Sequence, residues 1–412
     1  MATTLQAGET PPALGARQTR TLVGVASAHW LSHVHILVLP PLFPVLKTEL
    51  GVSYIELGLA ITLFGLVSGI TQAPMGALVD RVGARRILLG GLCLGGAAFM
   101  ALGLYPSYPM LLAAALVAGL ANSVYHPADY AILTAGVSDA RMGRAFSIHT
   151  FAGFLGGAMA PVMMAFIAAN WGLGAALLFA GALGPLVALA LIVLGIPDSK
   201  TAAEAAKEGG GKPPVTFRDV ASPAILMLTL FFVLLGLSTG GINGFGVPAL
   251  ISGYGLDLHS ASWGLTFFLG FASMGVLAGG FLADKTNRHG HVAAACFALN
   301  AVIVLTIALT SPPMIVLIAM LAVAGFLSGL IAPSRDMLGR KAAPEGAAGR
   351  AFGIVSTGFN IGSIIGPMIY GLIMDFEAPR WVFAVSALFM VLTVLLALVT
   401  ERREPAAATA PR

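Results

Sequence analysis

One stretch of the chain, GALVDRVGAR at residues 76–85, returns later as GFLADKTNRH at residues 280–289. The shift between the two copies, from Gly76 to Gly280, is 204 residues. Further pairs match at a shift of 206 residues, namely Pro127 with Pro333, Arg144 with Arg350, and Pro161 with Pro367. Separated anchors at one nearly constant offset indicate a duplicated unit. The sequence therefore predicts two homologous halves.

The composition indicates that these halves lie in a membrane. Of the 412 residues, 58% are hydrophobic and only 10% are charged, and the mean hydropathy is +0.91. A soluble domain does not present such a surface. Because one helical crossing takes about 20 residues, apolar runs predict an all-α polytopic protein of two pseudo-symmetric six-helix bundles. The predicted helices lie near 21–43, 54–79, 86–105, 108–135, 145–169 and 172–196, and near 222–251, 260–283, 291–310, 313–338, 351–374 and 379–400.

A polar stretch without apolar periodicity, DSKTAAEAAKEGGGKPPVTFRD, separates the two sets of helices and is typical of a flexible linker. The first 20 residues are polar and lack the apolar run of a cleavable signal peptide. We therefore expect a tail at 1–20, a bundle at 21–197, a linker at 198–221, a second bundle at 222–400 and a tail at 401–412.

Basic residues indicate the orientation. Of the 22 Lys and Arg residues, all but Lys47 and Arg380 fall on the side of the predicted tails, linker and even-numbered loops, with Arg335 near a helix end assigned to that side. This bias predicts that both tails and the linker are cytoplasmic in a multi-pass protein of the cell's inner (plasma) membrane. The net charge of +4 is then explained by topology, and no nucleic-acid partner is predicted.

The sequence resembles the major facilitator superfamily over its whole spanning region. The resemblance rests on the repeated loop, with Gly76, Asp80, Arg81, Gly83, Arg85 and Arg86 in the first copy and Gly280, Asp284, Lys285 and Arg288 in the second. In that family the loop follows helix 2, and its charges latch the halves together on the cytoplasmic side. The likeness implies a transporter in which a solute site between the halves opens alternately to each side of the membrane.

Within the superfamily, the sequence is similar to the fosmidomycin-resistance type of exporter. The likeness rests on NSVYHP at 122–127, AHWLSH at 28–33, and Gln72 before the loop. It implies export of a drug or an organic anion. In that type of exporter an acidic residue stands where His33 lies here.

Polar side chains share one face of the fourth predicted helix, where Asn122, Tyr125, His126 and Asp129 follow an i, i+3, i+4, i+7 spacing. Such a stripe is costly in hydrocarbon and normally points into the bundle or a wet cavity. We expect solute or proton binding by a set of polar residues in the spanning helices: His29, His33, Gln72, Asn122, Tyr125, His126, His149 and Asn360. The competing interpretation is an interhelical hydrogen bond that only packs the bundle.

These polar residues are expected at different depths in the membrane. At about 1.5 Å per residue, His33 is expected near the membrane centre and Asp129 near the cytoplasmic exit, within reach of the loop arginines. The predicted gating set is therefore Gly76, Asp80, Arg81, Gly83, Arg85, Arg86, Asp129, Arg144, Asp284, Lys285, Arg335 and Asp336. For Asp129, Arg335 and Asp336, a structural ion pair between helices is the alternative.

The sequence gives less support to a metal site or to enzymatic activity. His29 and His33, four residues apart on one helix face, could share a metal ion, but we expect no carboxylate or thiolate beside them as a helper ligand. Cys93 and Cys296 lie in separate apolar runs and indicate neither a disulfide nor a zinc site. No metal or cofactor is predicted. Because the chain also lacks an HExxH motif, a serine nucleophile elbow and a phosphate loop, we predict that it is not an enzyme.

The sequence thus predicts a monomeric secondary active transporter, an antiporter that drives efflux of a small organic solute with protons. A histidine is the expected titrating group because its ordinary pKa of about 6.5 lies near neutral pH. Import or exchange of a small organic acid is the alternative.

The orientation can be tested with cysteine labels placed near Gly210 in the linker and near Arg402 in the tail. Both labels should react only from the cytoplasmic side, because the positive-inside bias places both segments there. Membrane-impermeant maleimide on intact cells makes the measurement. Labelling of either site from outside would contradict the orientation and the even number of crossings.

Overall fold

The computed structural model describes the chain except for residues 1–14, 139–140, 199–222, 287–288, 343–347 and 404–412. Every regular element among the described residues is a helix. The first half contains α1 (Ala16–Ile36), η1 (Pro40–Leu42), α2 (Phe43–Leu50), α3 (Tyr54–Val82), α4 (Ala84–Leu104), α5 (Tyr108–Gly136) and α6 (Met142–Leu194). The second half contains α8 (Pro223–Tyr254), α9 (Leu258–Lys285), α10 (His289–Leu309), α11 (Met314–Ala342), α12 (Ala348–Asp375) and α13 (Trp381–Arg403).

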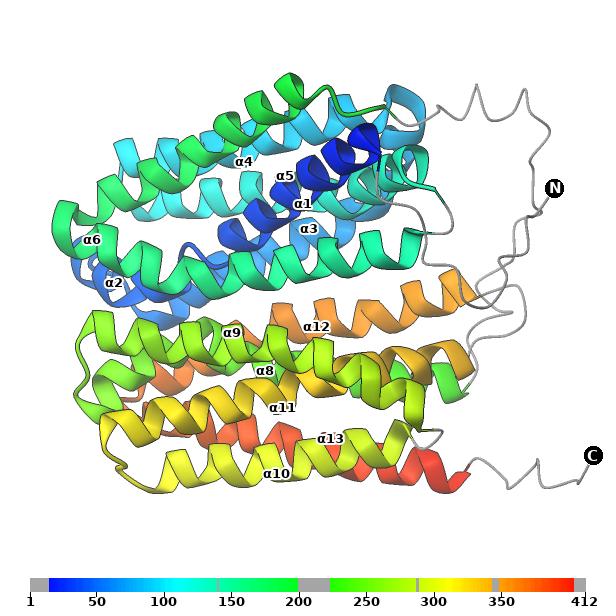
Figure 1. Cartoon of the computed structure of the whole chain (residues 1–412). Helices are drawn as coiled ribbons and strands as arrows, with labels where there is room; N and C mark the ends of the chain where they lie inside the picture. The colour runs from blue at the N-terminus through cyan, green and yellow to red at the C-terminus, as the bar shows by residue number, and fades with distance from the viewer. Residues whose placement is uncertain (1–14, 139–140, 199–222, 287–288, 343–347, 404–412) are drawn as a thin grey trace, which may run out of the picture.

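One helix, α6, supplies two membrane crossings. Among the described residues, 11 helices are long and apolar enough to span a bilayer, and α6 has 53 residues. A straight helix of that length would reach about 80 Å, far more than the hydrocarbon core of about 30 Å. The backbone leaves the helical region at Gly172, where φ is 85° and ψ is 170°, and Figure 1 shows α6 crossing the bundle and returning. The predicted twelve-helix fold is thereby confirmed.

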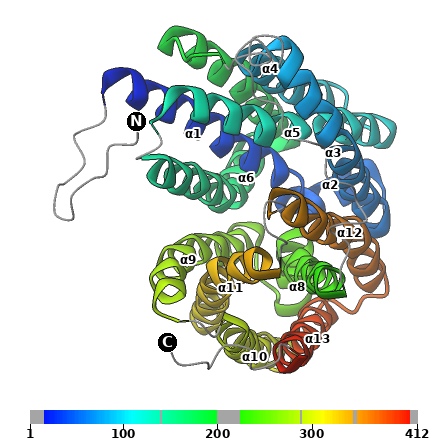
Figure 2. The same ribbon diagram turned by 90° about the vertical axis from the view of Figure 1, so that its right-hand side faces the viewer.

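The two halves lie one above the other in Figure 1, and Figure 2 shows each half as a ring of helices seen end on. The start of α1 and the end of α13 lie at the same end of the molecule, which we call the termini end; the other is the opposite end. Between the halves, α3 packs on α12 and α6 packs on α9. The predicted linker and tails lie almost wholly outside the described residues, so their boundaries stay predictions.

The prediction of one helix over 21–43 is wrong at both ends. Helix α1 begins at Ala16 and ends at Ile36, and the chain continues as the short 3₁₀ helix η1 and then α2. Pro40, Pro41 and Pro44 lie in this segment. Proline has no N–H to donate and its ring clashes with the preceding turn, so the helix cannot run on at full pitch.

Side chains cap the starts of α3 and α9 at the opposite end. The Ser53 side chain accepts from the backbone N–H of Glu56, whose carboxylate accepts from the Ser53 N–H at 2.7 Å, which forms a capping box at the start of α3. At the start of α9, the Asp257 carboxylate accepts from the Ser260 N–H at 2.9 Å. This bond to the charged form lowers the pKa of Asp257.

A carboxylate from the second half caps a helix of the first half. Asp375, the last residue of α12, accepts from the backbone N–H groups of Tyr54 and Ile55 at 2.8 Å each. Lys47 Nζ lies 3.7 Å from the same carboxylate. The first N–H groups of a helix have no partner within it and carry partial positive charge, so a carboxylate is stabilised there. We call this contact the Asp375 clamp.

Close helix packing extends the contact along the seam between α3 and α12. A Cβ at Gly58 would lie 2.5 Å from the Pro367 carbonyl oxygen, so only glycine permits this approach. The Thr62 hydroxyl donates to the Ile364 carbonyl at 2.8 Å. The halves are therefore held together at the opposite end by a charged cap and a tight backbone contact.

Replacing Asp375 with Asn should loosen this end, because an amide offers one acceptor in place of two and removes the charge. A hydrogen bond to a charged group contributes about 1.5–3 kcal/mol, so we expect the population opened at the opposite end to rise about tenfold or more. Electron-spin distances between labels at Glu49 and Phe376, which are exposed in different halves, report the opening.

Lys47→Gln is the matched control. It removes a partly exposed ion pair of small free energy but keeps both backbone hydrogen bonds, so its effect should be much smaller. Equal distance distributions in Asp375→Asn and the parent protein would contradict the clamp.

Candidate functional site

Three helices of the first half bring four histidines and one aspartate together. Helix α1 carries His29 and His33, α5 carries His126 and Asp129, and α6 carries His149. We call these five residues the histidine–aspartate cluster. The i, i+4 spacing on α1 and the i, i+3 spacing on α5 point each pair to one side of its helix.

Glycines on α6 permit the close approach of α1 that forms the cluster. A Cβ at Gly153 would lie 2.7 Å from the His29 imidazole, and one at Gly156 would collide with the Trp30 carbonyl oxygen. Without side chains at these positions, the α1 backbone and the His29 ring pack directly on α6. The small residues therefore set the distance between His29 and His149.

One carboxylate oxygen lies between two imidazoles. His149 Nε2 lies 3.0 Å from Asp129 Oδ2, within hydrogen-bond distance, and His29 Nδ1 lies 3.5 Å from the same oxygen. The rings of His29 and His149 stack with centroids 3.7 Å apart and planes inclined by 20°. The rings of His33 and His126 lie 4.8 Å and 5.2 Å from that of His29.

The side chains of the cluster range from buried at its centre to exposed at its edge. Asp129, His149 and His29 have exposed fractions of 0%, 1% and 4%. His33 is half-buried, and His126 is exposed. The cluster thus has an accessible side at His126.

Several buried polar atoms near the centre have no hydrogen-bond partner within the described part of the chain. They are Asp129 Oδ1, His29 Nδ1 and the Tyr125 hydroxyl. Leaving a buried polar group unpaired costs about 1–3 kcal/mol. Such groups in a native structure indicate strain or a ligand. One of these atoms belongs to the Asp129 carboxylate, and His29 Nδ1 lies 3.5 Å from its other oxygen.

Asp129, expected near the loop arginines, has its carboxylate against His149 and His29 instead. The premise that no carboxylate neighbours His29 is therefore wrong. Asp129 is 100 residues away in sequence, and helix packing supplies the contact.

The other candidate solute residues lie outside this contact group. The Asn122 amide donates to the Ser68 hydroxyl at 2.8 Å and so ties α5 to α3. Asn360 lies on the seam between α12 and α3, where its amide packs beside Gly69. Gln72 is half-buried on α3. His35, which the spacing places on another face of α1, donates from Nε2 to the Ala180 carbonyl at 3.0 Å.

The repeated loop lies at the termini end and is held by a residue that the sequence did not single out. The Asp198 carboxylate, just after α6, accepts from the Arg85 backbone N–H at 2.9 Å. Gly83 has φ 102°, and a Cβ there would lie 2.7 Å from the Asp198 carboxylate. This position therefore requires glycine for its conformation and for space. The only sequence signal for Asp198 was its place at the start of the polar linker.

The remaining gating candidates are spread over the termini end. Gly76 packs near Pro127, and the Arg335 guanidinium lies 5.0 Å from the centre of the Phe232 ring. The side chains of Asp284 and Asp336 lie outside the described residues. Exposed charged side chains complete the set: Asp80, Arg81, Arg86, Arg144 and Lys285.

A cavity of about 300 Å³ lies between the halves, beside the cluster. Phe154 in its wall contacts the His33 ring with centroids 6.4 Å apart, and Phe146 contacts Tyr130 at 5.1 Å. Tyr130 in turn contacts the His149 ring at 5.6 Å. Aromatic rings therefore connect the cluster to this cavity. It is lined by Phe146, Ser147, Thr150, Phe151, Phe154, Ser273, Val276, Leu277, Gly280 and Pro333.

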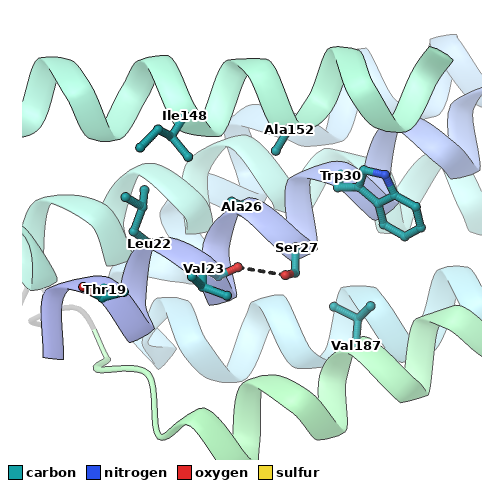
Figure 3. A pocket seen from close by; sticks show the side chains of 9 residues that line it. All are labelled: Thr19, Leu22, Val23, Ala26, Ser27, Trp30, Ile148, Ala152 and Val187. Atoms are coloured by element: carbon teal, nitrogen blue, oxygen red, sulfur yellow. Dashed lines mark hydrogen bonds between the residues drawn. The ribbon is translucent and has the colours of Figure 1, made fainter. Parts of the chain in front are cut away.

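A larger groove of about 580 Å³ lies between α1 and both arms of α6 (Figure 3). Its walls are mainly apolar, with Trp30, Ile148 and Val187 among them. The Ser27 hydroxyl in this groove donates to the Val23 carbonyl at 2.8 Å, as Figure 3 shows. Solute sites fix orientation with a few directed polar groups, and this groove offers fewer of them than the cluster.

Replacing Tyr125 with Phe separates stability from solute binding. Because the buried hydroxyl has no hydrogen-bond partner among the residues that the structure describes, its removal should leave the free energy of unfolding unchanged or raise it by up to about 1 kcal/mol. Solute transport should fall if the hydroxyl is reserved for the solute. Thermal unfolding and flux, measured on the same preparation, give both quantities.

Ser68→Ala is the matched control, because it strands the Asn122 amide and should cost about 1–3 kcal/mol. A loss of stability in Tyr125→Phe as large as that in Ser68→Ala would show that the hydroxyl is already paired.

Known proteins share this architecture. A family model described as Major Facilitator Superfamily matches residues 25–246 and 228–412. The fosmidomycin resistance protein of Escherichia coli (strain K12) is 27% identical over 283 residues, which cover 66% of this chain and 68% of that protein. The chloramphenicol resistance protein of Streptomyces lividans is 28% identical over 345 residues, covering 81% and 83%.

A solved structure has the same fold. The crystal structure of a bacterial homolog to the human lysosomal transporter Spinster, in an inward-facing and occupied conformation, has a TM-score of 0.78 to this chain. It is 15% identical and covers 95% of this chain and 98% of that one. Since the family model matches both halves of the bundle, the chain belongs to the Major Facilitator Superfamily.

Proposed function

We propose that this chain is a secondary active transporter that exports a small organic solute across the inner membrane in exchange for protons. The observation that carries the proposal is the fold itself, two six-helix halves that meet along helix seams and are clamped at the opposite end. Such halves expose a site between them alternately to each side. Export is supported by two relatives that are named resistance proteins.

The seam between α3 and α12 suits a rocking motion. Gly58, Gly65 and Gly69 recur along the face of α3 that meets α12. Small residues let helices approach closely and leave few side chains to unlock when the helices shift. We propose that the halves turn about this seam, and that breaking the Asp375 clamp opens the opposite end.

The polar groups of the first half supply the proposed solute contacts. Ionisable residues inside spanning helices are costly and usually mark solute or ion pathways, which also supports the proton as the coupling ion. His126 is exposed and His33 half-buried, and an imidazole can donate and accept hydrogen bonds. The Tyr125 hydroxyl and Asn122 lie on the same helix as His126.

The proposed orientation places the termini end in the cytoplasm. The two basic residues at the opposite end both have structural contacts that explain their presence there. Lys47 approaches the Asp375 carboxylate, and Arg380 donates to the Gly253 and Thr310 carbonyls. These exceptions therefore do not weaken the positive-inside bias. We propose that the unit is a monomer, because each chain contains both halves.

Flux into membrane vesicles tests the proposal. Inside-out vesicles that contain the protein should accumulate a solute from a panel of neutral and anionic drugs when their interior is acidic, because protons leaving the lumen would drive solute inward. A protonophore should abolish the accumulation. Vesicles from cells without the protein are the control.

The other outcomes are equally specific. Accumulation only in right-side-out vesicles with an acidic exterior would indicate an importer of organic acids. Exchange that ignores the pH gradient would indicate a solute exchanger. Either result would overturn proton-driven export.

A further inference from the structure

We propose that His29, Asp129 and His149 form a binding site for one divalent transition-metal ion of the Zn²⁺ or Co²⁺ type. All three are buried, and each offers one ligand atom. The site joins α1, α5 and α6 within the first half. It is therefore distinct from the contacts between the halves and requires no particular direction of transport.

The spacing of the ligand atoms fits such an ion. The three atoms lie within 4.8 Å of one another, and the two distances to Asp129 Oδ2 are 3.0 Å and 3.5 Å. With bonds of about 2.0–2.2 Å, ligands at tetrahedral angles lie roughly 3.3–3.6 Å apart. The two distances to Asp129 Oδ2 bracket this range. Because the His29 and His149 rings stack with centroids 3.7 Å apart, both rings would tilt to point their nitrogens at one ion.

The donor atoms select the class of metal. Two imidazole nitrogens and one carboxylate oxygen suit Zn²⁺, Co²⁺ and Ni²⁺. Ca²⁺ and Mg²⁺ prefer oxygen ligands and larger or more hydrated shells. The site should therefore discriminate against both of these hard cations.

The orphaned polar atoms give an independent reason to expect a ligand. Asp129 Oδ1 and His29 Nδ1 are buried without a hydrogen-bond partner within the described part of the chain. A metal ion would use the His29 nitrogen directly and would neutralise a carboxylate that is otherwise expensive to bury. Proton sharing between Asp129 and His149 alone leaves His29 Nδ1 without a hydrogen-bond partner among the described residues.

The site has an open position and an accessible side. Three protein ligands leave a fourth position for water or another donor, as in zinc sites with three protein ligands and one water. His126 is exposed, and its ring lies 5.2 Å from that of His29. We infer that ions enter past His126, which can serve as a transient ligand.

Metal binding is best measured on the whole protein in lipid nanodiscs, purified without a histidine tag. Titration with Co²⁺, followed by its d–d absorption, should show one ion bound per chain with tetrahedral intensity. Metal analysis after Zn²⁺ loading and gel filtration gives the stoichiometry independently. Asp129→Asn and His149→Gln should each weaken binding about tenfold or more, since loss even of an outer-shell partner costs 10–100-fold.

His35→Gln is the matched control, because His35 is equally buried on α1 but shares a hydrogen bond with the Ala180 carbonyl outside the cluster. It should bind one ion like the parent protein. Zn²⁺ should also raise the unfolding temperature of the parent and of His35→Gln, but not that of Asp129→Asn. Unfolding without metal shows that each variant is folded.

Two results would overturn the site: a parent protein that binds no Co²⁺ or Zn²⁺, or binding that persists in both Asp129→Asn and His149→Gln. Neither result bears on export, because binding is measured without transport. Conversely, loss of proton-driven flux in vesicles would leave the metal site standing.

Discussion

A bilayer gives a polar group no partner, and this constraint shapes the whole molecule. Helices satisfy their own backbone groups, so every regular element among the described residues is a helix, and ionisable side chains must turn inward. Asp129 is the extreme case, a carboxylate with no exposed surface. Its position depends on α1 lying close against α6, which in turn depends on glycines that remove side chains from the contact. The packing of the three helices therefore also determines which polar groups of the cluster meet.

Two other aspartates make the same kind of contact but stabilise different parts of the molecule. Asp198 accepts from the Arg85 backbone N–H, and Asp375 accepts from those of Tyr54 and Ile55, each at the start of a helix. Asp198 binds at the start of α4 within its own half, so it stabilises the loop without linking the halves. Asp375 caps α3 from the other half and therefore favours one arrangement of the two bundles. A carboxylate at a helix start stabilises the arrangement of the two bundles only when the helix belongs to the other bundle.

The cluster has a buried centre and an exposed edge, and these two parts suit different proposed roles. His126 is accessible and can meet a solute or an incoming ion, whereas Asp129 and His149 lie where electrostatic interactions are strong. The aromatic contacts from His33 to Phe154 and from His149 to Tyr130 and Phe146 connect it to the cavity between the halves. Direct ring packing therefore links the cluster to the wall of that cavity.

The amino-acid sequence by itself determined the duplicated halves, the twelve crossings and the helices that carry polar groups, because these depend on apolar run length and repeat offset. It missed the end of α1 at Ile36 and the roles of Asp198 and Asp375. It also placed Asp129 beside arginines and gave His29 no carboxylate neighbour. Only the tertiary structure decided these contacts, which join residues from about 20 to more than 300 positions apart. Helical periodicity says which residues share a face, whereas the tilt and closeness of neighbouring helices decide which faces meet.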